Sequence, residues 1–535
     1  MKLDVNPPPE SRFAQTATSG GSAISPDGRT LAYVATDAKG TSLLYLRPLH
    51  SLQAHAIPGT EEAGRPFWSP DSKSLAFVAS GKLKRIDAAG GVPINLCDAD
   101  FARGGTWNED GVILFGERNS GLLRIAASGA GACAPVTKIN QTAGEVNHYY
   151  PNFLPGGKEF LYLVLHSDAA KGGIYWGSLD GKPPVQILQS AYNGIYDATA
   201  GRLLYIQGDG VLTARKLELH PPRLTGDPVI VAQGVGGFSA NGYVEFSISG
   251  NGTLFYGQGT LTEKRHFEWW DRTGKRIESV GQAAEVSFTG YSISPDGSRV
   301  AFTAGRNPVD IWVMPFASGI ATRLTFTGGT YPRWSPEGKH IYYANAGNIY
   351  KRAADGSGAE ELLSKGGSVS SVSPDGKHLL YGFGDIFMLP LEGEKKPAPY
   401  LQTKFFEGGA VFSPDGLWVA YHSDESGRTE VYIQGFPERR GKWQVSAEGG
   451  FSPHWRADGK ELYWLGNDRR SVMAAPMELQ AGGVKAGRPE LLFRAPSLGV
   501  LSRDGKRFLA QAPEGGEQPS LPMVVVEHWA AGLGK

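Results

Sequence analysis

Short runs of apolar residues recur along the whole chain, each placed a few residues after a turn-like tetrapeptide. Clear examples are Leu31–Val34, Leu75–Val78, Val300–Phe302 and Ile341–Tyr343. Their alternating or continuous apolar character and their β-branched and aromatic residues predict short strands that are buried on both faces. A third strand, such as Leu43–Leu46, and a more polar fourth strand follow in each period. The pattern therefore predicts four strands per repeat, which is typical of a propeller blade.

The tetrapeptide is Ser-Pro-Asp-Gly in its clearest copies, which start at Ser25, Ser294, Ser373 and Ser413. Pro fixes φ at the second position, Asp can accept backbone N–H groups, and Gly occupies the position that benefits from a positive φ. Variants bring the total to twelve turns, roughly 38 to 51 residues apart, and eleven of them keep the Gly. This spacing is the period of propeller blades. The variants start at Ser69, Asn108, Leu154, Ala198, Ser249, Ser335, Arg456 and Ser502.

Twelve blades exceed the usual four to eight per ring, so the repeats predict an all-β protein of two tandem β-propellers with six four-stranded blades each. We place an N-terminal arm at residues 1–16, the first propeller at 17–286 and the second at 287–535. A split into seven and five blades is the alternative. The last repeat, from Ser497 onward, has only three evident strands, the third being Met523–Trp529.

An incomplete last blade would leave an open strand edge, which invites aggregation. We predict that Ser11–Thr16 donates the missing strand, which requires the N-terminus to reach the second ring. A chain that leaves one ring and later returns to it is the alternative topology.

Four tryptophans, Trp68, Trp107, Trp334 and Trp455, stand just before turns on the strand that should lie innermost. We interpret them as packing between blades, the alternative being stacking on a ligand.

The composition narrows the classes of function. Seventy-three Gly and 35 Pro among 535 residues, with 11% aromatic residues, indicate many turns between buried strands rather than disorder. Fifty-three basic and 53 acidic residues cancel, which removes the electrostatic footprint of a nucleic-acid-binding protein. No stretch approaches the roughly 18 to 20 apolar residues of a membrane span, so we expect no membrane insertion by this chain.

Cys97 and Cys133 are the only cysteines. They lack the number and the spacing of a zinc site. We predict buried free thiols, with a disulfide between neighbouring blades as the alternative, because the sequence cannot give the distance that a bridge requires.

The turn-and-strand units resemble TolB-type propeller repeats, which are WD-like blades that carry Ser-Pro-Asp-Gly in place of Trp-Asp. Longer stretches look like the propeller region that lies C-terminal to the membrane span in bacterial serine/threonine kinases of acidobacterial type. The resemblance implies a sensor or protein-interaction module, which is extracytoplasmic when it follows a membrane span. The stretches are Gly105–Phe115, His148–Tyr162, Leu203–Gly234, Trp269–Gly274, Asp310–Tyr343 and Val524–Leu533.

The chain departs from that family because it contains no kinase domain and no membrane span. Ala512-Pro513-Glu514 spells one kinase tripeptide, but no Gly-rich loop, His-Arg-Asp or Asp-Phe-Gly motif accompanies it. We therefore expect a periplasmic location if the chain is a fragment of a membrane-anchored receptor, and a cytoplasmic one if it is complete.

Sequence motifs of hydrolases, metalloproteases, calcium loops and phosphate-binding loops are absent. We predict no catalytic residue, no metal site and no cofactor. The alternative is a carbohydrate-active enzyme, a polysaccharide lyase or hydrolase built like oligogalacturonate lyase, with His, Arg or carboxylate groups converging on one channel. His148, His454 and His422 are the histidines that could lie near such an axis.

The most plausible binding site is the channel mouth, where loops lead from the outer strand of one blade into the inner strand of the next. Arg and aromatic residues are enriched there, as in the hot spots of protein and peptide interfaces. We predict a non-catalytic sensor or scaffold that binds a protein, peptide or small ligand at these mouths. The candidate residues are Arg65, His148, Tyr149, Tyr150, Tyr331, Arg333 and His454.

Two of these candidates, Tyr150 and Tyr331, precede Pro, so packing between blades is their alternative role. His148 and His454 could titrate near neutral pH.

Overall fold

The structure is a computed structural model whose described residues form almost entirely β-sheet, with short 3-10 helices at Gln141–Ala143 and Trp529–Gly532. It forms two compact units: unit 1 comprises residues 1–262 and 518–535, and unit 2 comprises residues 263–517. Neither helix in the described ranges is long and apolar enough to cross a membrane. The structure describes residues 2–14, 20–37, 41–99, 102–117, 120–166, 168, 170–238, 242–259, 264–284, 286–305, 309–382, 384–467, 471–480, 482–495, 499–514 and 522–532.

The repeated turn is stabilised by its own side chains. At the first copy, the Ser25 hydroxyl donates to Asp27 Oδ1, at 2.5 Å, and accepts the backbone N–H of Thr30, at 2.9 Å. Asp27 Oδ1 also accepts the N–H of Arg29, and Gly28 adopts a φ of 72°. The same Ser-to-Asp hydrogen bond recurs in the copies that start at Ser294, Ser373, Ser413 and Ser502.

Unit 1 contains six sheets of four or five antiparallel strands and one short hairpin, β23–β24. Its inner strands β3, β7, β11, β15, β19 and β25 contact one another in that order, and β25 returns to β3, so the ring is closed. Five sheets are continuous in sequence. Their strands, from the inner edge outward, are β3 (Ser22–Ile24), β4 (Thr30–Asp37), β5 (Ser42–Pro48) and β6 (His55–Ala56); β7 (Gly64–Trp68), β8 (Ser74–Ala79), β9 (Lys82–Asp87) and β10 (Ile94–Asp98); β11 (Arg103–Trp107), β12 (Val112–Gly116), β13 (Leu122–Ala126) and β14 (Ala134–Pro135); β15 (Glu145–Phe153), β16 (Glu159–His166), β17 (Gly173–Ser178) and β18 (Val185–Gln189); and β19 (Gly194–Asp197), β20 (Arg202–Gln207), β21 (Val211–Leu219) and β22 (Pro222–Ala232).

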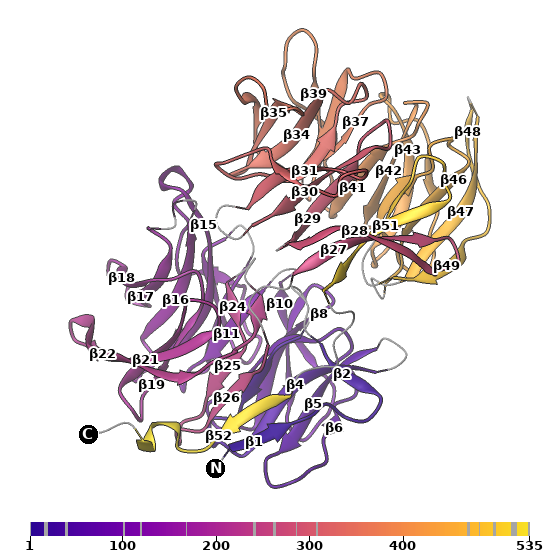
Figure 1. Cartoon of the computed structure of the whole chain (residues 1–535). Coiled ribbons are helices and arrows are strands. Elements are labelled where there is room, and N and C mark those ends of the chain that lie inside the picture. The colour runs from indigo at the N-terminus through magenta and orange to yellow at the C-terminus, as the bar shows by residue number, and fades with distance from the viewer. Residues whose placement is uncertain are drawn as a thin grey trace. The chain divides into compact units, whose positions relative to one another are not determined.

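The sixth sheet of unit 1 is completed by both ends of the chain. Its order is β25-β26-β52-β1, and the C-terminal strand β52 pairs with β26 on one side and with the N-terminal strand β1 on the other. Figure 1 shows the yellow β52 beside the indigo β1 and the magenta β26. The strands are β25 (Phe246–Ile248), β26 (Leu254–Gly257), β52 (Met523–Val526) and β1 (Lys2–Val5), and the hairpin before them is β23 (Gly237–Phe238) and β24 (Tyr243–Val244).

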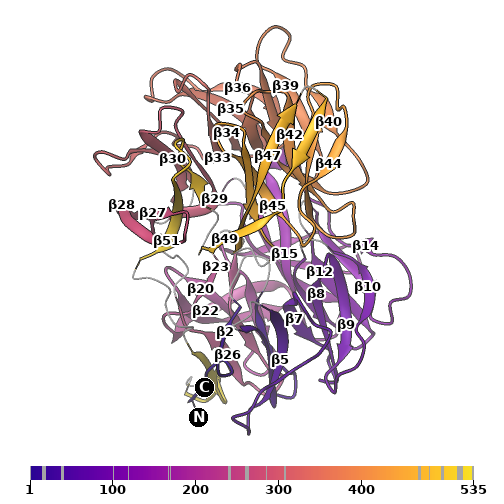
Figure 2. The same ribbon diagram turned by 90° about the vertical axis from the view of Figure 1, so that its right-hand side faces the viewer.

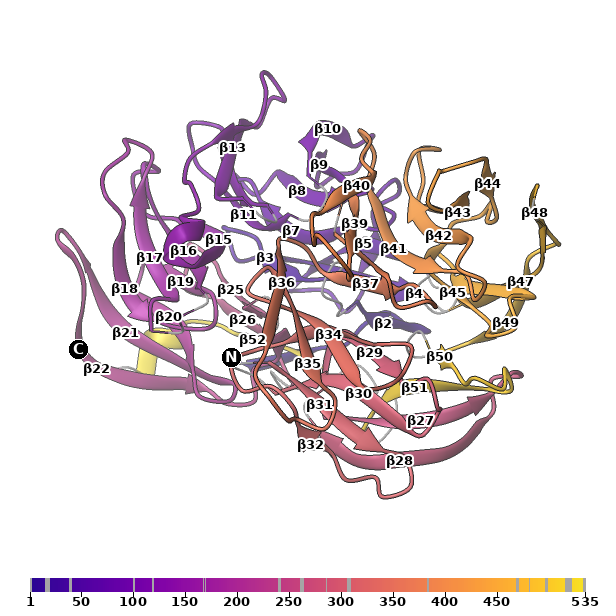
Figure 3. The ribbon, with the colours of Figure 1, turned by 90° about the horizontal axis from the view of Figure 1, so that it is seen from above.

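Unit 2 also has six sheets, five of them continuous in sequence. Figure 3 shows the inner strands β29, β37, β41, β45 and β50 around a common centre, with β28, β32, β44 and β48 at the periphery. The continuous sheets are β29 (Val286–Ile293), β30 (Arg299–Ala304), β31 (Asp310–Pro315) and β32 (Thr322–Arg323); β33 (Thr330–Trp334), β34 (His340–Asn345), β35 (Asn348–Ala353) and β36 (Glu361–Lys365); β37 (Val369–Val372), β38 (His378–Tyr381), β39 (Ile386–Pro390) and β40 (Ala398–Leu401); β41 (Glu407–Phe412), β42 (Trp418–Ser423), β43 (Glu430–Gly435) and β44 (Lys442–Gln444); and β45 (Phe451–Trp455), β46 (Glu461–Leu465) and β47 (Ser471–Gln480), which pairs with both β48 (Gly483–Ala486) and β49 (Glu490–Arg494).

The sixth sheet of unit 2 joins the two ends of that unit. Its order is β50-β51-β27-β28, so the last strands supply the inner half and the first strands supply the outer half. Figure 2 shows β51 beside β27 and β28. Hydrogen bonds connect this sheet to both of its neighbours. The N–H of Leu501 donates to the Tyr463 hydroxyl, and the Tyr291 hydroxyl donates to the carbonyl of Leu509. The strands are β50 (Val500–Leu501), β51 (Arg507–Pro513), β27 (Arg265–Asp271) and β28 (Arg276–Ala284).

Two propellers of six blades, mainly four-stranded, are thus confirmed, but the predicted boundaries of 1–16, 17–286 and 287–535 are wrong. Residues 263–286 belong to unit 2, because β27 and β28 complete its last sheet, and residues 518–535 belong to unit 1. The alternative topology, in which the chain leaves one ring and later returns to it, is the one observed. It leaves no blade without its outer strands.

The predicted role of Ser11–Thr16 as donor to the last blade is also wrong. Strand β2 (Ser11–Phe13) pairs with residues 35–37 of β4, in the first sheet of unit 1, and residues 15 and 16 lie outside the described ranges. Phe13 packs against Tyr33 there, with ring centroids 5.2 Å apart. Burial of Phe13 in that sheet holds the segment in unit 1.

The core lies between successive blades. The second strand of each sheet is nearly continuously buried, as in Leu31–Ala35, because it packs against a blade on both faces. The indole N–H groups of Trp68 and Trp334 donate to the carbonyls of Ala23 and Ser292 in the preceding blade, at 2.9 and 3.0 Å. Trp107 and Trp455 pack against the cores of their neighbouring blades, which confirms the predicted role of all four tryptophans.

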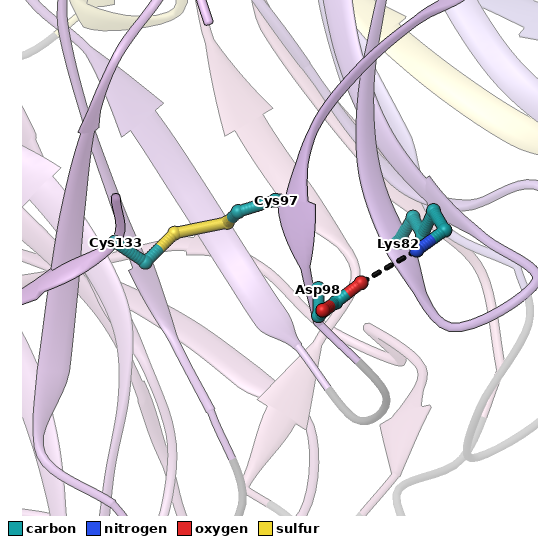
Figure 4. Close-up of a disulfide and its surroundings, with 4 residues drawn as sticks. All are labelled: Lys82, Cys97, Asp98 and Cys133. Carbon is teal, nitrogen blue, oxygen red and sulfur yellow. Dashed lines mark hydrogen bonds and ion pairs between the residues drawn. A yellow bond between two sulfur atoms is a disulfide. The ribbon is translucent and has the colours of Figure 1, made fainter. Parts of the chain in front are cut away.

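The two cysteines form a disulfide, so the prediction of free thiols is wrong (Figure 4). Cys97 lies in β10 and Cys133 lies just before β14, which are the outermost strands of adjacent blades, with Cα atoms 6.4 Å apart. This separation is within the range that a disulfide spans. The bond therefore links two neighbouring blades of unit 1 at their outer edge.

Candidate functional site

The mouth-side part of the inner strands carries a β-bulge in most blades. The register shifts between residues 64 and 67, 149 and 152, 330 and 333, and 451 and 454. At the bulge stand residues with a left-handed backbone, a conformation that is costly for side chains other than Gly and that marks positions worth testing for function. They are Arg65 (φ 52°), Tyr150 (φ 51°), Tyr331 (φ 54°) and Ser452 (φ 50°).

Glycine takes the same position in other blades and allows the bulges of neighbouring blades to approach. A Cβ atom at Gly104 would lie 2.7 Å from Tyr150 Cδ1 and 3.2 Å from Tyr150 Cα. At Gly290 the nearest atom is Tyr331 Cα, and at Gly409 it is the ring of His422, with Ser452 Cα 3.5 Å away. The backbones of neighbouring bulges are thus closely packed against one another at the mouth of each ring.

A second repeated position lies two residues before the first residue of each turn, and we call it the bridging position. Its side chain reaches the inner strand of the next blade. Thr106 Oγ1 accepts the N–H of Phe153, Asn152 Oδ1 accepts that of Tyr196 and Ser247 Oγ accepts that of Ile24.

The two units differ at the bridging position. Unit 1 has only neutral side chains there, whereas unit 2 has a guanidinium and an imidazole. The residues in unit 1 are Ala23, Phe67, Thr106, Asn152, Tyr196 and Ser247, and those in unit 2 are Ser292, Arg333, Ser371, Val411, His454 and Val500.

The candidates at the mouth of unit 1 form a filled cluster. The guanidinium of Arg65 lies over the ring of Tyr243, with its carbon 3.7 Å from the ring centroid. Tyr150 packs beside Tyr243 at 5.7 Å and beside Tyr149 at 5.8 Å between ring centroids. Arg65 and Tyr150 are only 5% and 7% exposed, and burial raises the pKa of the Tyr150 hydroxyl. These side chains pack against one another and leave little surface for a ligand.

His148 is 3% exposed and serves the structure of unit 1. The Thr137 hydroxyl accepts the N–H of Leu122, at 2.7 Å, and lies 2.8 Å from His148 Nδ1. His148 Nε2 faces the Glu145 carboxylate, with Oε2 at 3.2 Å, so Nε2 of the neutral ring carries the proton and Nδ1 accepts a hydrogen bond from the Thr137 hydroxyl. Burial lowers the pKa of His148, partly offset by the Glu145 carboxylate.

A hydroxyl in the equivalent position, just after the outermost strand, occurs in other blades. Thr325 accepts the N–H of Ile311 and donates to Asp310, and Ser446 accepts the N–H of Val431 and donates to Glu430. His148 takes the place of that carboxylate. Its role was missed because the pattern becomes visible only when the hydroxyls of several blades are compared.

The candidates at the mouth of unit 2 are partly accessible. Tyr331, Arg333 and His454 are all half-buried. Arg333 Nε donates to the carbonyl of Ser370 in the next blade, at 2.7 Å, and Nη1 donates to the carbonyl of Pro332, at 2.9 Å. Among the described residues no carboxylate forms an ion pair with Arg333. The surrounding strands reduce the hydration of the guanidinium, and this desolvation lowers the pKa of Arg333 to about 10.

His454 lies three blades from Arg333, on the opposite side of the ring. Its imidazole stacks on Tyr463, with ring centroids 5.4 Å apart. Burial and the positive charge of Arg333 lower the pKa of His454 to about 3, so the ring is neutral at physiological pH. His454 therefore does not titrate near neutral pH.

Three aromatic or imidazole neighbours complete these sites. Tyr243 packs against Arg65, and Tyr463 packs against His454. His422 stacks on Phe406 and packs at a tilt against Phe451. Its Nδ1 accepts the N–H of Ser452. Sequence reasoning missed Tyr243 and Tyr463 because one lies in a short hairpin outside the repeat and the other in a second strand, where apolar residues are expected. In the described residues, no group of three or more His, Cys, Asp or Glu side chains is arranged to hold a metal ion.

No protein-family profile and no curated protein sequence matches the chain. Among solved structures, 47% of the chain is similar to 99% of a TolB protein from Agrobacterium tumefaciens, at 18% identity and a TM-score of 0.38. Ninety-six per cent of the chain is similar to 59% of the tricorn protease, at 13% identity and a TM-score of 0.32. An oligogalacturonate lyase in complex with manganese is similar to 64% of the chain over 89% of its own length, at 12% identity and a TM-score of 0.29. At these identities and TM-scores, the two-propeller architecture follows from the chain's own sheets and their closure.

Proposed function

We propose that the chain is a non-catalytic β-propeller sensor or scaffold that binds a protein, peptide or small ligand, and that the mouth of unit 2 is the binding site. The observation that carries this proposal is the contrast between the mouths: Arg65 and Tyr150 are buried in unit 1, whereas Tyr331, Arg333 and His454 remain half-buried in unit 2.

The physical case rests on rigidity and chemistry. Tyr331 sits in a bulge whose backbone is held by Gly290 of the preceding blade, and Arg333 is anchored by two carbonyl groups. Side chains that are already ordered lose little entropy on binding. Tyr and Arg are also the residue types that contribute most to protein and peptide recognition.

The sensing role in this proposal comes from the resemblance of the sequence to the propeller regions of bacterial receptor kinases. The competing hypothesis is a carbohydrate-active enzyme, for which His, Arg and carboxylate groups would have to converge on one inner face. Release of unsaturated or reducing sugar ends from polysaccharides by the purified chain would favour that hypothesis.

Site-specific photo-crosslinking tests the proposal. Benzoylphenylalanine in place of Tyr331 keeps a large aromatic side chain at the mouth of unit 2, and the same residue in place of Ile277 is a matched control, because Ile277 is 51% exposed on the outer strand β28. In an extract of the source organism we expect a discrete adduct from position 331 that is absent from position 277. No adduct at 331, or equal labelling from both positions, would contradict the proposed site.

A further inference from the structure

Arg333 is a cation in the inner wall of unit 2 to which the described part of the protein supplies no anion. We infer that this guanidinium holds a carboxylate group of the ligand, an inference that rests on the proposed function and names the chemistry of its site.

The geometry of Arg333 leaves part of its hydrogen-bonding capacity available. A guanidinium has five N–H donors. Nε is used by the carbonyl of Ser370 and one N–H of Nη1 by that of Pro332, whereas no described residue accepts a hydrogen bond from Nη2. These two anchors fix the plane of the group, so the remaining donors are presented in a defined direction. A planar fork of this kind matches the two oxygens of a carboxylate.

The electrostatic surroundings favour an anion. Desolvation lowers the pKa of Arg333 and Tyr331 raises it, and no described carboxylate contributes to this pKa. Glu407, which lies in the inner strand β41, interacts with Thr403, Asp385, Asp424 and Glu425. A cation in a poorly hydrated site without a counter-charge is unfavourable, and a bound anion would remove that cost.

The other candidate side chains at this mouth are compatible with a single negative charge. His454 is neutral and can donate one N–H without adding charge, and Tyr331 offers an aromatic ring and a hydroxyl. One guanidinium balances one carboxylate, whereas a phosphate of nearly two negative charges would need a second cation. The bridging position of unit 2 holds no second Arg or Lys, and that of unit 1 holds none.

Titration of the full chain with short capped peptides tests the inference. The probes are acetyl-Gly-Asp-Gly-amide, its neutral isostere acetyl-Gly-Asn-Gly-amide and inorganic phosphate, all at constant ionic strength, with binding followed by saturation-transfer NMR. We expect the Asp peptide to bind at least tenfold more tightly than the Asn peptide and more tightly than phosphate. Arg333→Gln should abolish this preference, and Arg333→Lys should retain part of it.

Arg440→Gln is the matched control, because Arg440 is 81% exposed in the same unit and its loss changes the net charge by the same amount. It should leave the preference intact. Equal affinities for the Asp and Asn peptides, tighter binding of phosphate, or a preference that survives Arg333→Gln would each overturn the inference. Should Arg333→Gln unfold, the comparison of the probes on the wild-type chain and on Arg333→Lys decides alone. A discrete crosslink from position 331 combined with equal peptide affinities would retain the proposed function and reject the carboxylate.

Discussion

Unit 1 and unit 2 are built from the same repeat, but they are closed by different strands and carry different side chains on their inner walls. The last sheet of unit 1 takes its third and fourth strands from β52 and β1, at the two ends of the described chain, whereas that of unit 2 joins β50 and β51 to β27 and β28. The mouth of unit 1 is filled by the cluster of Arg65, Tyr150 and Tyr243, and a disulfide links two of its blades.

The two units differ in how their bulge residues are packed. Where the bulge residue is buried against a neighbouring aromatic ring, as at Tyr150, the costly backbone conformation is offset by packing. Where it stays half-buried, as at Tyr331, packing offsets less of that cost, and such residues cluster at functional sites. The bulge residue Tyr150 of unit 1 is therefore a packing residue, whereas Tyr331 of unit 2 keeps part of its side chain exposed.

The largest expected effect concerns the strand that seals unit 1. Val524 in β52 is fully buried, so Val524→Asp places an unpaired carboxylate in the core and should destabilise unit 1 by about 4 kcal/mol or more. Hydrogen exchange followed by mass spectrometry should show loss of protection in residues 2–259 while unit 2 stays protected. Leu509→Asp in β51 should give the reverse pattern, and Ile277→Asp on the exposed outer strand should change neither. Simultaneous loss of protection in both units from either substitution would show that the units do not fold independently.

Reduction of the disulfide should affect unit 1 alone. Cys97 and Cys133 are 36 residues apart, and closure of a loop of that size stabilises a fold by about 4 kcal/mol. Scanning calorimetry with and without a phosphine reductant should show a lower transition temperature for unit 1 and an unchanged one for unit 2. The double variant Cys97→Ala/Cys133→Ala should already have the lower value and should not respond to the reductant. A transition of unit 2 that moves with the reductant would contradict the division.

The two bulge tyrosines should respond differently to the same substitution. Tyr150→Gly removes a buried ring and should cost about 2.5 kcal/mol even after relief of the backbone strain. Tyr331→Gly relieves the same strain but removes a half-buried ring, so its cost should stay below about 1 kcal/mol. Urea denaturation of both variants measures the difference. Equal losses would mean that Tyr331 is as much a packing residue as Tyr150.

The smallest effect is a pH dependence of unit 2. The pKa of His454 is about 3 in the folded chain and about 6.5 when unfolded, so between these values the unfolded state binds more protons. The effect of His454 on stability is small at pH 7 and above, and stability falls as the pH decreases, by about 2 kcal/mol at pH 5. The difference in unfolding free energy between wild type and His454→Gln should change by this amount from pH 7 to pH 5. A constant difference would show that His454 is more hydrated than its surroundings indicate.

The local structure was predictable because it depends on residues that are close in sequence. The turn at Ser25–Gly28 and the strand at Leu31–Val34 are determined by the residues within each segment. The positions of the tryptophans before the turns follow from the same repeat. The position of Arg333 followed from the same repeat, since it precedes Trp334 by one residue.

Ring closure could not be predicted, because it depends on pairing between distant segments. Val524 pairs with Tyr256 and with Asp4, and an all-apolar strand such as Met523–Val526 fits the doubly buried position of either ring. The contacts of His148 could not be predicted for a similar reason, since its partner Thr137 lies in another blade. The disulfide likewise required the spatial distance between two outer strands.

The return of the chain to unit 1 fixes the order in which the protein can be completed during synthesis. All of unit 2 leaves the ribosome before β52 does, so unit 2 can close while five blades of unit 1 wait with an unpaired edge at β26. Strand β52, which follows unit 2 in the chain, joins β26 to β1. Premature termination between residues 513 and 523 would therefore give a protein in which unit 2 has its strands but unit 1 keeps a free strand edge at β26, which makes the product a target for chaperones and proteases.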